Sequence, residues 1–216
     1  MAQKTAPHRN ELLCALAPAD SQRLAPHLKL IHLRLGAVLY EPGDRIRHAY
    51  FPQTAMVSLA AVMEAGHAIE IAVIGKDSLV PAIAGLGLSR AFSRAVVQGS
   101  GEASRIAVTA LRDAVRDRPT LRELLLRHHE LVLLQIQQTA ACNTMHEVEA
   151  RLARWLLQYI DASATETIAL TQEFLSQLLG VRRETVNASI HSLEETARCA
   201  SAAAGSKFLT AINCRK

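Results

Sequence analysis

The stretch LTQEFLSQLLGVRRETVNASIHSLEE, from Leu170 to Glu195, contains two short helical patterns on either side of a glycine. The first pattern begins with Thr171, whose hydroxyl group is suited to cap a helix N-terminus. It ends at Gly180, where a left-handed residue commonly closes a helix. The second pattern begins near Arg182. Two helices joined by such a tight turn predict a helix-turn-helix.

Two arginines, Arg182 and Arg183, stand at the start of the second predicted helix. The N-terminal end of a helix carries partial positive charge and disfavours basic side chains, so this pair indicates an anionic partner. In a DNA major groove, the N-terminal residues of such a helix meet base edges, and arginine reads guanine with two hydrogen bonds. Taken alone, the pair also fits a solvated surface. The helix–glycine–helix frame around it favours DNA reading.

The second helix has one apolar face, formed by Val186, Ile190 and Leu193. With this face inward, a rotation of about 100° per residue turns the opposite face to solvent. The residues on that outward face are Glu184, Asn187, Ala188, His191 and Glu195. Glutamate accepts from cytosine and threonine hydroxyls suit phosphate contacts. The predicted DNA-binding residues are therefore Thr171, Arg182, Arg183, Glu184, Thr185, Asn187 and His191.

The sequence before this motif divides into three zones of different predicted secondary structure. Residues 8–30 form short helical patterns, and residues 30–110 consist of short apolar runs separated by turn sequences such as EPGD and EAGH. This arrangement predicts an all-β roll or sandwich, and alternation in HAIEIAV predicts a strand with one solvated face. Residues 119–146 then predict one long helix, with Pro119 in its first turn. A second helix follows in HEVEARLARWLLQYIDA.

The long helix carries a seam with alternating steps of three and four residues, which is typical of helix–helix dimers. The seam predicts a dimer interface formed by Leu121, Leu124, Leu131, Gln135, Gln138 and Cys142, with His128 and Met145 in the same register. The alternative is that this stripe packs onto the chain's own β-roll.

Composition limits the classes of function. The net charge is +4 with a pI of about 9.1, which is compatible with an anionic partner. The four cysteines include no C-x-x-C pair, so no metal site and no cofactor is expected. No apolar run approaches the ~18 residues of a membrane span, and the N-terminus is a poor signal peptide, so a cytoplasmic protein without membrane contact is expected. Patterns typical of an enzyme are lacking.

LTQEFLSQLLGVRRETV closely resembles the winged-helix motif of the cyclic AMP receptor / fumarate-nitrate regulator (Crp/Fnr) family of bacterial transcription factors. LYEPGDRIRHAYFP is similar to the opening strands of that family's cyclic-nucleotide-binding-type β-roll, and QTAACNTMHEVEARLARWLLQ to its dimer helix. The resemblance covers roughly residues 10–195. It implies an α+β chain with a sensor roll and N-terminal helix (1–118), a dimerisation helix (119–146) and a winged-helix domain with an atypical wing (147–216).

The resemblance implies a homodimer that binds a palindromic double-stranded DNA operator, with RNA polymerase as a further candidate partner. It puts Arg183 and Glu184 at base-reading positions and Thr171 and Thr185 at backbone-contact positions. Where the family often has a further arginine, this chain has Ala188.

Two regions depart from the family pattern. The sensor lacks the Gly-Glu and Arg-Ser pairs of cyclic-nucleotide binders, so an effector other than cyclic AMP is expected, with Arg90 and Arg94 as candidate contacts for an anionic effector. After Glu195, the sequence TARCASAAAGSKFLTAINCRK is a poor wing, although Gly205 would allow a hairpin turn. The alternative function is a dimeric sensor whose specific DNA binding is weakened or lost.

Overall fold

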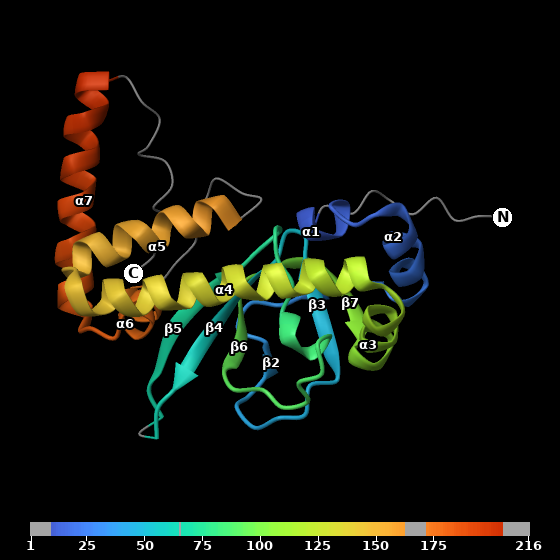
Figure 1. Cartoon of the computed structure of the whole chain (residues 1–216). Helices are drawn as coiled ribbons and strands as arrows, with labels where there is room; N and C mark the ends of the chain where they lie inside the picture. Colours follow the sequence, from blue (N-terminus) through green and yellow to red (C-terminus); the bar gives the residue numbers. More distant parts are fainter. Residues whose placement is uncertain (1–9, 65, 163–171, 205–216) are drawn as a thin grey trace.

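A long helix, α4, runs along the chain and joins a β-roll to a helical C-terminal unit (Figure 1). The structure is a computed structural model that describes residues 10–64, 66–162 and 172–204, with side chains in the last range to residue 195. Ahead of the roll lie α1 (Glu11–Cys14), α2 (Pro18–Leu24) and the 3₁₀ helix η1 (Ala25–His27). Behind it lie α3 (Val108–Asp117) and α4 (Pro119–Met145). The long helix thus occupies the range that the sequence predicts.

Two antiparallel sheets form the roll, which confirms the predicted β zone. The strands are β1 (Lys29–Leu33), β2 (Val38–Tyr40), β3 (His48–Pro52), β4 (Met56–Val62), β5 (Ala68–Ile74), β6 (Arg94–Gly99) and β7 (Gly101–Ala107). Over the described residues, one sheet has the order β1-β7-β3 and the other β2-β6-β4-β5. The short 3₁₀ helix η2 (Ala82–Ala84) lies between β5 and β6 and packs against α4.

The interior of the roll is closed by α4. Alternate strand residues such as Val57, Ile74 and Val97 point into a common core, and Val132 and Ile136 of α4 pack against it. A second cluster joins α1, α2 and α3 to the N-terminal half of α4, where Leu121 and Leu125 are almost fully buried. The inner face of α4 is therefore covered by its own chain along most of its length.

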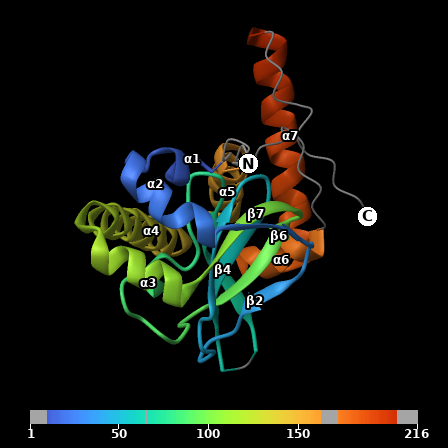
Figure 2. The same ribbon diagram turned by 90° about the vertical axis from the view of Figure 1, so that its right-hand side faces the viewer.

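The C-terminal helices pack on the outer face of the four-stranded sheet. They are α5 (Val148–Ala162), α6 (Gln172–Leu179) and α7 (Arg183–Ala204). Their core contains Leu152, Trp155 and Val186, and it also includes Met56 and Val73 from the sheet. Figure 2 shows α6 beside the strands of this sheet. Both faces of β5 are covered as a result, so the prediction of a solvated face on this strand is wrong.

One close approach fixes the junction between the sheet and α5. Gly75 follows β5 directly, and a Cβ atom there would overlap the carbonyl oxygen of Ala162 at the end of α5. The backbone N–H of Lys76 donates to the same carbonyl oxygen at 3.2 Å. Glycine at this position allows the two backbones to meet.

The last described helix is longer than predicted. α7 continues from Arg183 to Ala204 rather than ending near Glu195, so residues 196–204 are helical where the strand of a wing was considered. Gly205 and the rest of the predicted hairpin lie outside the described residues, as does Thr171. In the part of the chain that the structure describes, no helix combines the length and apolar character that a membrane crossing requires.

Candidate DNA-binding site

The turn between α6 and α7 has the geometry that the sequence predicts. Gly180 is left-handed, with φ of +65°. Its N–H donates to the carbonyl oxygen of Gln177 at 3.3 Å, and the N–H of Val181 donates to that of Ser176 at 3.0 Å. These two bonds satisfy the terminal carbonyl groups of α6 in a Schellman motif. The chain can then change direction within a few residues and begin α7.

The first turn of α7 is open to solvent. The carbonyl oxygen of Arg182 accepts from the N–H groups of Thr185 and Val186 at 3.1 and 3.2 Å, which starts the helix. The side chains of Arg182, Arg183, Glu184 and Thr185 are all exposed. None of the four has an ion-pair partner within the described residues. Two guanidinium groups, one carboxylate and one hydroxyl group therefore face solvent at a helix N-terminus, as a groove reader requires.

The inward face of α7 holds this turn in place. Val186 is fully buried and Ile190 is 6% exposed, and both pack among the residues of α5 and α6. Leu193 continues the same face at helical spacing. Figure 1 shows the rest of α7 extending beyond the body of the molecule. Burial on one face therefore orients the opposite face outward.

Two predicted readers further along α7 differ in position. His191 is exposed, and its Nδ1 lies 3.6 Å from Oε2 of Glu194. Asn187, in contrast, is half-buried, and its Oδ1 is shielded from solvent without a hydrogen-bond partner among the described residues. The prediction that Asn187 points fully outward is wrong, because it lies at the edge of the buried face. Ala188 is exposed and has no side-chain hydrogen-bonding group.

Arg151 on α5 supports the turn and was not predicted. Its guanidinium group donates to the carbonyl oxygen of Leu179 at the end of α6 and, at 3.1 Å, to Oδ1 of Asn143 on α4. Partial burial and the nearby charge of Arg154 lower the pKa of Arg151 below its usual value. One side chain thus ties the long helix to the turn that precedes α7. No sequence pattern indicated this role, because an arginine on an amphipathic helix usually faces solvent.

The predicted dimer seam on α4 is only partly accessible. Leu121 and Cys142 are 1% and 3% exposed, and Leu124 packs against the cluster beneath α1–α3. Gln135 is half-buried, whereas Leu131 and Gln138 are exposed. The seam is therefore wrong for Leu121, Leu124 and Cys142, which are covered by their own chain. α4 carries apolar residues on both its covered face and its exposed face. The spacing of three and four residues therefore selected positions from both faces.

The outward face of α4 carries a different apolar set. Its exposed large hydrophobic residues are Leu126, Leu131, Leu133, Leu134 and Met145, with exposed fractions between 37% and 78%. We call these five residues the outer α4 stripe. Several large apolar side chains exposed on one helix indicate an interaction surface.

The two arginines considered for an effector do not line the interior of the roll. Arg94 pairs with Glu41, whose two carboxylate oxygens lie 2.8 and 3.0 Å from its Nε. Arg90 donates to the carbonyl oxygen of Gly43 at 2.8 Å and is exposed. A cavity of about 230 Å³ does lie between the roll and α4, but its walls are mostly apolar, with Leu59, Ile71, Val132 and Ile136 among them. Neither arginine belongs to those walls.

Comparison with known proteins gives concordant results. Residues 150–199 match the model of the Crp-like helix-turn-helix domain. The chain is 28% identical over 157 residues to a CRP-like cAMP-activated global transcriptional regulator of Mycobacterium tuberculosis, which covers 69% of each protein. The fold resembles the c-di-GMP responsive global regulator CLP of Xanthomonas campestris (TM-score 0.65, 16% identity, 84% and 93% of the chains covered). It also resembles FixK2 of Bradyrhizobium japonicum (TM-score 0.67, 14% identity, 79% and 86% covered).

Proposed function

Because this chain belongs to the Crp/Fnr family of DNA-binding transcription regulators, we propose that it reads a two-fold symmetric DNA site as a homodimer. Each subunit places the first turn of one α7 helix in a major groove. The observation that carries the proposal is the exposure of Arg182, Arg183, Glu184 and Thr185 at the start of that helix. The family is one of regulators rather than enzymes.

The roles of the readers follow from their chemistry. Arg183 donates to the O6 and N7 atoms of a guanine, and Glu184 accepts from the N4 group of a cytosine. Arg182, Thr185 and the exposed backbone N–H groups of the first turn contact phosphates and fix the register. His191 lies further along the outward face of α7 and adds a contact to the DNA beyond those of the first turn. Asn187 contributes least, because its Oδ1 is shielded.

A second copy of the chain fits the outer α4 stripe. α4 has 27 residues and is about 40 Å long, which allows an extended contact. Of the eleven exposed large hydrophobic residues in the described chain, five lie on this helix. A two-fold contact between two such helices would cover them and place two α7 helices on one side of the dimer. DNA half-sites about one helical turn apart then become accessible together.

We propose further that this regulator does not use cyclic AMP as an effector. A cyclic phosphate requires a cationic partner in the binding cavity, whereas Arg90 and Arg94 hold other groups, and the cavity of about 230 Å³ is mostly apolar and has no arginine or lysine in the part of its wall that the structure describes. The Mycobacterium tuberculosis relative is named cAMP-activated, and the proposal separates this chain from it in that respect. Calorimetry with cyclic AMP should give no binding heat, and saturable micromolar binding would contradict this part of the proposal.

Gel-shift titration on genomic DNA fragments tests the function. The wild-type chain should give a specific band that survives competitor DNA. Arg183→Ala should cost about 1–3 kcal/mol of specific binding. Arg116→Ala is the matched control, because Arg116 is an exposed arginine on α3, away from α7. Equal and weak binding of the wild-type chain to every fragment would mean that specific reading has been lost.

A further inference from the structure

A carboxyl group is buried where the DNA-binding helices meet the sensor sheet. Glu70 lies on β5 and is 8% exposed. Its Oε1 accepts a hydrogen bond from the indole Nε1–H of Trp155 on α5. Ser58 on β4 is its second hydrogen-bonding neighbour. The contact between Glu70 and Trp155 therefore crosses from the sensor roll to the DNA-binding unit.

The burial of Glu70 is incompletely compensated. Its Oε2 is shielded from solvent and has no hydrogen-bond partner among the described residues. Burial raises the pKa of Glu70 to about 7, although the hydrogen bonds from Ser58 and Trp155 and the charge of Arg154 act in the opposite direction. An ionised carboxylate in such a site loses more hydration than these partners return.

The groups around Glu70 come from four elements. Arg154 of α5 is the cation whose charge acts on Glu70. Its Nη1 donates to Gln158 at 2.9 Å and to Thr139 of α4 at 3.3 Å, and its Nε has no partner among the described residues. Arg94 of β6 lies on the wall of a cavity of about 350 Å³ between the sheet and α6, and is paired with Glu41.

On the helical side, the residues near Glu70 are mostly uncharged. α6 contributes Phe174, Gln177 and Leu178 to the same cavity, and β4 contributes Ser58. The ring of Tyr159 on α5 lies 5.1 Å from that of Trp155 at a tilt of 44°, and burial raises the pKa of Tyr159 further above neutrality. Among the described residues of the cavity wall, Glu70 is the only carboxyl group.

We propose that Glu70 is a proton-controlled latch, whose protonated form holds the DNA-binding helices against the sensor sheet and whose ionised form favours their release. The apolar contacts of Met56 and Val73 with these helices hold the interface in either state. The protonation state of Glu70 changes the total strength of docking on top of these apolar contacts. The consequence for DNA reading rests on the proposed function, whereas the docking itself does not.

The direction of the pH effect follows from linkage. In the docked arrangement the pKa of Glu70 is about 7, against an ordinary value of 4.5 for a solvated glutamate. The contribution to docking is fully present below the ordinary value and is lost as the pH rises through about 7. With these two values, docking weakens roughly tenfold between pH 6 and pH 8.

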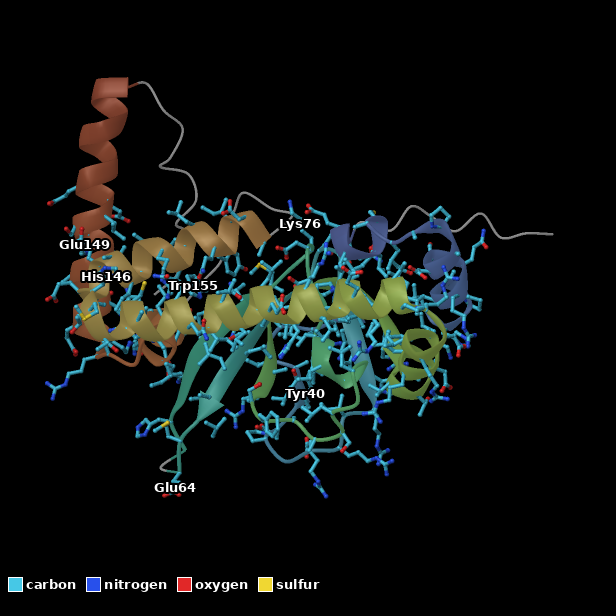
Figure 3. The ribbon with its side chains drawn as sticks, viewed as in Figure 1. Tyr40, Glu64, Lys76, His146, Glu149 and Trp155 are labelled. Atoms are coloured by element: carbon cyan, nitrogen blue, oxygen red, sulfur yellow. The ribbon has the colours of Figure 1, made fainter. Side chains whose placement is uncertain are left out.

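The single tryptophan of the chain provides a direct readout. Trp155 lies on α5, as labelled in Figure 3, and its indole donates to Glu70. Its fluorescence in the full-length protein should show a transition centred near pH 7 during titration from pH 5 to 9. Glu70→Gln keeps a hydrogen-bond acceptor but cannot ionise, so it should retain the low-pH emission throughout.

The control and a second variant keep the latch testable. Glu64→Gln removes an exposed carboxylate at the far tip of the β4–β5 hairpin (Figure 3) and should titrate as the wild type does. Ser58→Ala removes a hydrogen bond that lowers the pKa of Glu70, so its midpoint should move to higher pH. An identical transition in Glu70→Gln, an unshifted midpoint in Ser58→Ala or a flat wild-type curve would each overturn the latch.

Hydrogen exchange and DNA binding separate the two proposals. Corrected for intrinsic rates, amides of β5 and α6 should exchange faster at pH 8 than at pH 6 in the wild-type chain, and equally in Glu70→Gln. If the protein shows this difference but binds every DNA fragment equally, the latch is supported and the proposed function is contradicted. If the protein binds specific DNA but shows no difference in exchange between pH 6 and pH 8, only the latch is contradicted.

Discussion

The guanidinium group of Arg151 donates to the backbone carbonyl oxygen of Leu179, the last residue of α6. Through its second bond, to Asn143, the same side chain connects the end of α4 to the turn before α7. The contact therefore links the end of α4 to the turn that precedes the helix carrying Arg183.

Removing this connection should destabilise the DNA-binding unit. Arg151→Met keeps much of the aliphatic packing but leaves the Leu179 carbonyl without its charged donor. Hydrogen bonds to charged groups contribute about 1.5–3 kcal/mol, so the free energy of unfolding should fall by about that amount. Urea denaturation followed by circular dichroism measures the change. Arg116→Met is the control on an exposed helix surface, and equal stability of the two variants would show that the Arg151 contact contributes nothing.

His128 should make the protein less stable in mild acid. It is 5% exposed on α4, and its Nε2 accepts from the N–H of Leu79 at 3.2 Å, which requires the neutral ring. Burial, with a smaller contribution from His129, lowers its pKa to about 4, although Asp77 acts in the opposite direction. A depressed histidine pKa means that the unfolded chain takes up the proton first. Stability is therefore lost as the pH falls from about 6.5 towards 4, by about 1.4 kcal/mol per unit of pKa shift.

His128→Gln should remove this dependence, because glutamine accepts from Leu79 without titrating. Unfolding free energies of the wild type and the variant, measured at half-unit steps from pH 7 to 4, give the difference in slope. His146→Gln, which changes an exposed histidine just after α4 (Figure 3), should behave as the wild type. Parallel pH curves for the wild type and His128→Gln would show that His128 does not titrate as described.

The outer α4 stripe should control assembly. Leu131 is 65% exposed in the single chain, so Leu131→Asp should leave the fold intact and yield monomers by light scattering. Leu157→Asp, at a residue 51% exposed on α5, is the matched control and should remain dimeric. A dimeric Leu131→Asp protein would place the interface elsewhere on the surface.

Local sequence signals predicted the elements and the turn, but not the contacts between elements. Gly180 and the apolar spacing of Val186 and Ile190 are short-range features, and the structure agrees with them. The accessible face of α4 depends on which side the roll covers, and no local pattern contains that information. Glu70 shows the same limit. Its alternating strand predicted a solvated face, and only the packing of α5 and α6 on the sheet buries it.

The specificity of the first turn of α7 is the central claim, and selection of binding sites from random DNA tests it most directly. The wild-type chain should enrich a two-fold symmetric sequence, and Arg183→Ala should lose preference at one base pair in each half-site while keeping the others. Enrichment of no sequence by the wild type, or of an identical sequence by Arg183→Ala, would contradict the account.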